Sequence, residues 1–327
     1  MAVQLQSESW ELFGSLKLAK QLTAGETLAR LGDEHPEIVA LCADLGYPTR
    51  LADFGKKFPD RFFDFGIAEK NMVSAAAGLA ATGKIPFVAT YASFLGLLCC
   101  EQIRTDVAYP NLNVRLIGTH TGIAMGFYGS SHHATEDIAI LRSMANMAVI
   151  SPADGVAFAQ MIEESVASYA GPIYFRVSRG REETVYTEGR PGNKIGKANV
   201  LREGRDITII ACGIEVKASL DAAEFLANQG IQARVIDMHT IKPLDLDAVL
   251  EAARETGAIV TVEEHNILGG LGGAVAEVLM ESGISCKFKR HGIMDQYALI
   301  GKPYHLYKHY KLDGNGIASV VNDFLSR

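Results

Sequence analysis

The 327-residue sequence has no dense basic segment, no low-complexity tract and no apolar run long enough to cross a membrane. Its formal net charge is −7, and without a basic block it lacks the electrostatic footprint for nucleic acid or an anionic membrane surface. The most apolar stretch, residues 85–100, follows Lys84 and ends at Glu101, so it is too short for a transmembrane helix. We therefore expect neither nucleic acid nor a membrane as a partner.

Cysteine spacing of the zinc or disulfide type is also missing. The five cysteines are scattered and form no Cys-x-x-Cys pair. This favours structural thiols in a reducing compartment over a disulfide framework or a zinc site. The first residues, among them Gln4, Glu8 and Lys17, contain no apolar core of the signal-peptide type. A cytoplasmic location is the expectation.

What is present is an alternation of short apolar segments with helical segments of crossover length. Strands are expected at 38–42, 62–65, 86–91, 114–118, 147–152 and 172–177, and then at 207–213, 233–238 and 258–264. The charged, glycine-rich segment 180–204 is the linker candidate. The pattern predicts two doubly wound α/β domains, residues 1–188 and 195–327, which bind ligands at the carboxyl ends of their strands.

Glu69 follows an expected buried strand that contains Phe62, Phe63 and Phe65, and it falls in the first turn of a helix rich in small residues, up to Ala80. The helix dipole favours the carboxylate there, whereas desolvation raises its proton affinity. By itself, this position suits either a glutamate satisfied by backbone amides or a functional acid.

Two further groups of side chains follow expected strands. Tyr91 and Phe94 are aromatic residues at a strand end, which suits either a core or a stacking role. His120 and the pair His132 and His133 lie in or beside the glycine-rich segment 122–131. Lone histidines are more often structural, but function concentrates in loops of this kind. No third ligand has a convincing spacing, so we predict no metal site.

The sequence Phe-Asp-Phe-Gly-Ile-Ala-Glu-Lys-Asn-Met at 63–72, with its small-residue helix, resembles the pyrimidine-binding segment of the transketolase family of thiamine diphosphate enzymes. The resemblance implies that Glu69 hydrogen-bonds the ring nitrogen of the cofactor's aminopyrimidine. It also implies that Tyr91 and Phe94 surround this ring, and that Ile67 and Asp44 lie near the cofactor.

For the substrate, the resemblance implies that His120 and His132 contact its reacting oxygens, with His133 as a neighbour or spectator. Arg179, which follows a serine at a strand end, corresponds to the residue that binds the anionic part of the substrate.

Three positions depart from the family pattern. Tyr128 stands where an aspartate reads a substrate hydroxyl, and Lys20 and Pro48 replace an arginine and a serine that bind phosphate. The substrate is therefore expected to be unphosphorylated or to carry a different anion.

The chain lacks the Gly-Asp-Gly motif through which this family binds the diphosphate and Mg²⁺. The segment from Asp313 to Gly316 predicts only a turn. The resemblance, from about Lys17 to Phe324, thus implies the C-terminal subunit of a two-component enzyme. An N-terminal transketolase-like subunit would hold the diphosphate and Mg²⁺ in an α2β2 heterotetramer, and the complex would transfer a two-carbon ketol unit from a ketose to an aldehyde.

Two alternatives stay open at this point. A β subunit of a 2-oxo acid dehydrogenase shares the two-domain plan, although the paired histidines favour a transketolase. A non-catalytic structural subunit would keep only the interface. The glycine-rich segment 268–273 opens a helix, and its spacing favours close helix packing over a phosphate-binding loop.

Overall fold

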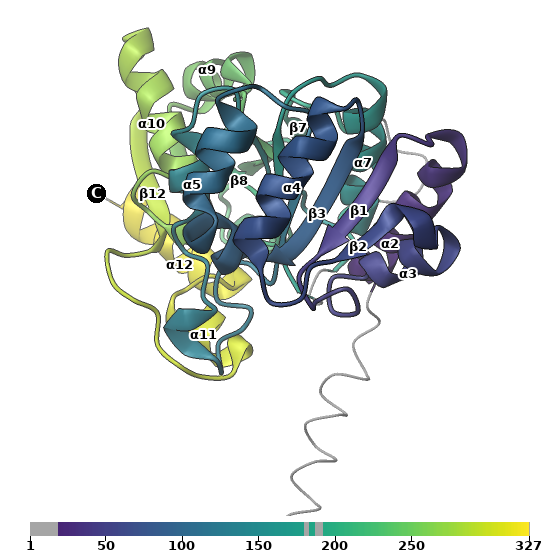
Figure 1. The fold of residues 1–327 in the computed structure, drawn as a ribbon. Helices are drawn as coiled ribbons and strands as arrows, with labels where there is room; N and C mark the ends of the chain where they lie inside the picture. The colour runs from purple at the N-terminus through teal and green to yellow at the C-terminus, as the bar shows by residue number, and fades with distance from the viewer. Residues whose placement is uncertain (1–18, 180–182, 187–191, 327) are drawn as a thin grey trace, which may run out of the picture.

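The computed structural model describes residues 19–179, 183–186 and 192–326, with side chains from residue 25 onward. It contains a seven-stranded and a five-stranded sheet, each with helices on both faces (Figure 1). The predicted α/β architecture with two doubly wound units is therefore confirmed.

The seven-stranded sheet has the strand order β10-β5-β6-β4-β3-β1-β2. Its strands are β1 (Ile38–Cys42), β2 (Phe62–Asp64), β3 (Ile85–Tyr91), β4 (Arg115–Thr119), β5 (Ala148–Ile150), β6 (Ile173–Val177) and β10 (Thr240–Lys242). Strands β1 to β6 pair in parallel, so their carboxyl ends meet at one edge. Strand β10 comes from the second half of the chain and pairs antiparallel with β5.

Two groups of helices cover this sheet (Figure 1). One face carries α2 (Ala19–Glu34), α3 (Leu51–Lys57) and α7 (Gly155–Ala167). The other face carries α4 (Glu69–Ala81), α6 (Asp137–Arg142) and the connection of η2 (Phe94–Leu98), α5 (Cys100–Gln102) and η3 (Ile103–Ala108), in which η2 and η3 are π-helical turns. Strand β1 is apolar throughout because its successive side chains pack against these two layers alternately.

The five-stranded sheet has the order β12-β11-β8-β9-β7. Its strands are β7 (Asn199–Arg202), β8 (Ile207–Ala211), β9 (Ala233–Asp237), β11 (Ala258–Asn266) and β12 (Lys287–Ile293). Helices α9 (Leu246–Thr256) and α10 (Leu271–Ser282) cover one face, and α8 (Glu215–Ala227) and α12 (Gly314–Leu325) cover the other, with α11 (Pro303–His309) beside them. One apolar cluster runs from α4 and α6 to α9 and α10, so the two units share a continuous core.

Three expectations about local structure were wrong. The strand at 62–65 is not buried, because β2 is the last strand at the sheet edge, and Phe63 is 38% exposed. The linker candidate 180–204 contains β7, which pairs antiparallel with β9. The segment at Asp313 begins a helix, because the Asp313 carboxylate accepts a hydrogen bond from the Gly316 amide and caps α12. The domain boundaries at 188 and 195 stay a prediction.

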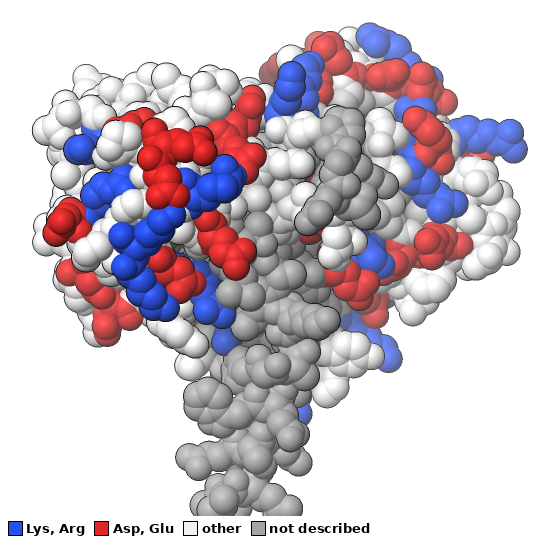
Figure 2. All heavy atoms as spheres, turned by 90° about the vertical axis from the view of Figure 1, so that its right-hand side faces the viewer, with Lys and Arg blue, Asp and Glu red and all other residues white. Residues whose placement is uncertain are grey.

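The described surface carries both signs of charge. On the face that Figure 2 shows, basic and acidic side chains are interleaved. Among the described residues, no helix combines the length and the apolar character needed to cross a membrane.

Candidate functional site

The neighbouring strands β6, β4 and β3 bring distant residues to one edge of the seven-stranded sheet. Tyr91 is the last residue of β3, His120 follows β4 directly, and Arg179 lies two residues after β6. Because the three strands are parallel, these side chains start from the same edge. This is the edge at which α/β sheets of this type bind ligands.

An aromatic and imidazole cluster occupies this edge. The Tyr91 ring centroid lies 4.4 Å from that of His120, 5.5 Å from that of Phe94 and 5.9 Å from that of His132. The Phe94 and His132 centroids are 5.4 Å apart. Tyr128 stacks on His132 at 4.7 Å with an interplanar angle of 24°. The cluster offers flat apolar faces beside two imidazoles.

His120 is held in a defined state. Its backbone has a φ of +58°, which is uncommon for a residue with a side chain, and 2% of the residue is exposed. The His120 Nδ1 lies 2.9 Å from Thr119 Oγ1, and the Thr119 hydroxyl donates to the Thr90 carbonyl at 3.3 Å. These two hydrogen bonds assign the proton to Nδ1 and leave Nε2 as an acceptor. Burial, followed by Arg179 and His132, lowers the pKa of His120 to about 3, so the ring is neutral.

The two histidines of the adjacent pair differ in their surroundings. His132 is part-buried within the cluster, and its Nδ1 lies 2.9 Å from Ser131 Oγ. His133 is 4% exposed, and burial lowers its pKa. Among the described residues, the ring contacts of the cluster involve His132 and not His133.

Arg179 reaches the cluster from the end of β6. Its Nη1 lies 3.3 Å from Met125 Sδ, and its charge acts on both Tyr91 and Tyr128. Burial lowers the pKa of Arg179, and the two tyrosines oppose this change. A half-buried cation beside two aromatic rings suits the binding of an anionic group.

Glu69 begins α4, as the sequence predicted, and 7% of the residue is exposed. Burial and then the Glu69 carboxylate raise the pKa of the Cys99 thiol to about 12. Cys99 ends the π-helical turn that begins at Phe94, to whose carbonyl its amide donates at 3.0 Å. The glutamate is therefore close to the turn that carries Phe94, and π-helical turns are frequent at functional sites.

Asp44 and Ile67 follow β1 and β2 and are exposed, Ile67 to 84%. The Asp64 carboxylate accepts hydrogen bonds from the Asp44 and Gly66 amides at 2.9 and 3.0 Å, which ties the two loops together. No ring or hydrogen-bond contact joins Asp44 or Ile67 to the cluster within the described part of the chain. Pro48 lies in the Asp44 loop, and the side chain of Lys20 lies outside the described residues.

The glycine-rich segment at the start of α10 is a packing device, as predicted. The Glu263 carboxylate accepts hydrogen bonds from the Leu271 and Gly272 amides at 2.7 and 2.9 Å and so occupies the helix N-terminus. A Cβ added at Gly272 would lie 2.7 Å from side-chain atoms of Arg290 and Thr261.

Two structural features of this edge escaped the sequence analysis. One is the buried pair of Arg176 and Asp137, in which Arg176 also donates to the Ala134 carbonyl. The other is Glu264, which reaches the histidine-containing loop from the second sheet. Both features join residues that lie far apart in the sequence, so no local pattern marks them.

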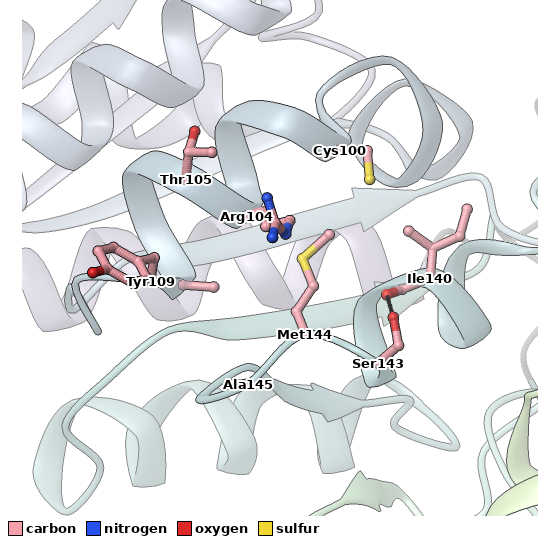
Figure 3. Close-up of a pocket in the computed structure, with 9 residues that line it drawn as sticks. Cys100, Arg104, Thr105, Tyr109, Ile140, Ser143, Met144 and Ala145 are labelled. Atoms are coloured by element: carbon pink, nitrogen blue, oxygen red, sulfur yellow. Dashed lines mark hydrogen bonds between the residues drawn. The ribbon is translucent and has the colours of Figure 1, made fainter.

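A hollow of about 610 Å³ lies elsewhere, between η3 and the end of α6 (Figure 3). Met144 extends toward Arg104, and Tyr109 lies at one end. None of the predicted site residues lines it. Within the ranges 19–179, 183–186 and 192–326, no three His, Cys, Asp or Glu side chains are grouped so as to hold a metal ion.

Fold and edge together define a two-unit α/β protein with a cluster of candidate site residues at the carboxyl ends of its first sheet. Residues 17–183 match the family "Transketolase, pyrimidine binding domain", and residues 196–317 match "Transketolase, C-terminal domain". The chain belongs to the transketolase family.

Three relatives are chains of similar length. A protein of Methanocaldococcus jannaschii described as a transketolase C-terminal section is 44% identical over 304 residues, which cover 93% of this chain and 95% of that protein. A subunit of the apulose-4-phosphate transketolase of Phocaeicola vulgatus is 39% identical over 302 residues (92% and 96%). A 6-deoxy-6-sulfo-D-fructose transketolase subunit of Clostridium sp. (strain MSTE9) is 38% identical over 302 residues (92% and 93%).

Among solved structures, a split gene transketolase described as an inactive beta4 tetramer superposes with a TM-score of 0.85 and 41% sequence identity. The match covers 94% of this chain and 98% of that chain. This chain is therefore a subunit of the split transketolase type.

Proposed function

We propose that this chain is the C-terminal subunit of a thiamine diphosphate-dependent transketolase that transfers a two-carbon ketol unit from a ketose to an aldehyde. The observation that carries the proposal is the cluster of Tyr91, Phe94, His120 and His132 at one sheet edge, beside the helix start at Glu69. The paired imidazoles in this cluster favour a transketolase over a 2-oxo acid dehydrogenase subunit.

The donor set fits the pyrimidine half of the cofactor. Glu69 offers a largely buried carboxylate for a ring nitrogen, and Tyr91 and Phe94 offer faces for a flat heterocycle. Asp44 and Ile67 follow the strands β1 and β2, and we propose that they lie near the bound cofactor. When bound, the cofactor supplies the electron sink for carbon–carbon bond cleavage.

The two histidines act on the substrate. The acceptor Nε2 of neutral His120 can receive a hydrogen bond from a substrate hydroxyl. His132, stacked on Tyr128, also lies beside Tyr91 and can bond a second oxygen. Together they hold and move protons at the reacting oxygens, which is the task of general acid–base groups.

The diphosphate and Mg²⁺ require a partner. Mg²⁺ prefers oxygen ligands, and the described residues of this chain offer no suitable group. We propose that an N-terminal transketolase-like subunit supplies these ligands in an α2β2 heterotetramer. The description of the structural relative as an inactive beta4 tetramer supports the need for a second chain.

The substrate is proposed to be a ketose with a terminal anion, held by Arg179. Tyr128 takes the place of a hydroxyl-reading aspartate, so we expect a preference different from that of common transketolases. Relatives named for a 4-phosphate and for a 6-sulfo sugar support an anionic end, and they show that its chemistry differs among relatives.

The first test is a calorimetric titration of thiamine diphosphate with Mg²⁺. The cofactor is added to this chain, and then to its mixture with a candidate diphosphate-binding subunit from the same genome. Binding in the mixture only, followed by ketol transfer across a panel of ketoses, is the expected result. Tight binding to this chain by itself would contradict the two-subunit site.

A further inference from the structure

The segment 121–134, here called the histidine loop, leaves the sheet after His120 and carries His132. Its two ends are joined by an isolated bridge, in which the Gly122 and Ala134 amides donate to each other's carbonyls at 3.0 and 2.9 Å. The first part of the loop, from the bridge to Gly126, is buried, whereas Phe127 and Tyr128 at its tip are exposed. The position of His132 therefore depends on the contacts at the neck of the loop, by which we mean residues 122–123 and 134–135.

Glu264, on β11 of the second sheet, holds this neck. Its Oε1 accepts a hydrogen bond from the Ile123 amide at 2.9 Å, across 141 residues of sequence. The Tyr307 hydroxyl of α11 donates to the same oxygen. Glu264 itself is 2% exposed, so solvent does not compete for these bonds.

Gly122 is shaped to receive this carboxylate. Its φ of +56° suits glycine, and a Cβ built on it would lie 2.0 Å from the carboxyl carbon of Glu264. Contacts this close leave no space for a side chain between the loop and the carboxylate. The glycine and the glutamate are thus matched across the two units.

Hydrogen bonds to backbone carbonyls join the same parts of the two units. The Arg176 Nη2 donates to both the Ala134 and the Glu264 carbonyls, at 3.0 and 2.9 Å. The Asn266 amide donates to the Thr135 carbonyl at 2.8 Å. The end of β11 therefore contacts both sides of the loop neck. Of these contacts, those made by the Glu264 side chain can be removed by substitution.

From this geometry we infer that Glu264 is a positioning residue, which sets the histidine loop, and with it His132, from the second domain. The inference rests on the proposed function for its kinetic consequence. It assigns the second domain a direct part in building the active site, since the residue that orders the loop is not in the first domain.

The surroundings of Glu264 make its hydrogen bonds to the loop and to Tyr307 sensitive to pH. Arg176 on β6, Asp137 on α6, Glu215 on α8 and Tyr307 on α11 all act on this carboxyl. Burial raises the pKa of Glu264 to about 7, although Arg176 opposes the change. Both donors to Oε1 favour the carboxylate form, so these hydrogen bonds weaken as Glu264 is protonated when the pH falls through 7.

Four variants of the assembled enzyme test the inference. Glu264→Ala removes the acceptor, Glu264→Gln keeps a neutral acceptor, and Tyr307→Phe removes one donor. Glu263→Gln is the matched control, because Glu263 is an equally buried neighbour whose hydrogen bonds go to α10. Each variant is measured by hydrogen exchange of the loop, by kcat and KM for the best ketose, and by cofactor affinity.

We expect Glu264→Ala to raise exchange over 122–134 and to lower kcat by about tenfold to a hundredfold, since a displacement near 1 Å can cost that much. Cofactor affinity should stay within about twofold, because Glu69, Tyr91 and Phe94 lie on elements other than the histidine loop. A loss of kcat at unchanged cofactor affinity would therefore separate an effect on the reaction from an effect on binding. Glu264→Gln should recover most of the activity. In the wild type, hydrogen exchange of the loop, corrected for intrinsic rates, should rise as the pH falls from 8 to 6. Glu264→Gln should not show this rise.

Unchanged loop exchange in a folded Glu264→Ala protein would overturn the inference. An equal rise of loop exchange in Glu263→Gln would also overturn it, because the effect would then be general destabilisation. If the wild-type complex transfers no ketol unit, the proposed function fails, but the exchange experiment still decides whether Glu264 orders the loop. If Glu264→Ala does not fold, Tyr307→Phe replaces it, with a smaller rise in exchange expected.

Discussion

Arg176 on β6 and Asp137 at the start of α6 form a buried ion pair, in which Arg176 Nε donates to Asp137 Oδ2 at 2.9 Å. Their side chains are 3% and 0% exposed. The Tyr174 hydroxyl donates to the same oxygen at 2.7 Å. Burial lowers the pKa of Arg176, but Asp137 and Glu264 outweigh it, so the guanidinium stays charged. The pair joins the sheet, the histidine loop and the second unit at one point.

Removing this cation should be strongly destabilising. Arg176→Met leaves the Asp137 carboxylate buried without its ion-pair partner, which we expect to cost about 3–5 kcal/mol of unfolding free energy. Denaturant unfolding of the variant measures the change. The matched control is Glu277→Gln, which breaks the exposed pair of Glu277 with Arg142 and should cost about 0–1 kcal/mol. Equal costs for the two variants would contradict the assigned role of the buried pair.

Glu69→Gln should abolish most of the activity without unfolding the protein. The substitution keeps the shape of the side chain at the start of α4 but removes the acid, and acid–base groups contribute about 10²–10⁴-fold to rate. Turnover of the assembled complex and the thermal unfolding temperature are the two measurements. Full activity in a complex with bound cofactor would remove Glu69 from the site.

The His120 ring should stay neutral in mildly acidic solution. Burial first, and then Arg179 and His132, hold its folded pKa at about 3, below the ordinary value of 6.5. The folded state therefore binds fewer protons between these values, so this group's contribution to stability is present above pH 6.5 and is lost as the pH falls toward 3. Nitrogen NMR of the ring at pH 5.5 measures the protonation state. A signal that titrates near 6.5 would show that the ring is solvated.

Arg179→Ala should discriminate between anionic and neutral substrates. A hydrogen bond to a charged group contributes about 1.5–3 kcal/mol, so kcat/KM for an anionic ketose should fall by about 10- to 100-fold. The value for an uncharged ketose should change much less. Arg104→Ala, an exposed arginine on η3, is the control for general loss of positive charge. Parallel losses for both kinds of ketose would argue against anion binding by Arg179.

Local patterns predicted most of the first sheet. Strands β1, β3, β4 and β6 are short, mostly apolar runs that are almost fully buried, and α4 begins at the predicted acid. Edge strands and short strands are harder to predict from local patterns. Strand β2 carries an aromatic run that is typical of a core but lies at the edge, while β10 has three residues and pairs with β5 from far along the chain.

By itself, the sequence determined the fold class through local periodicity and the family resemblance through the motif around Glu69. The resemblance then named the other candidate site residues, which lie in separate segments from Tyr91 to Arg179. Tertiary structure decided how these residues meet. It set the neutral state of His120 through burial, and it joined Glu264 to Ile123 across 141 residues. Burial and long-range pairing depend on which elements pack together, and no short stretch of sequence carries that information.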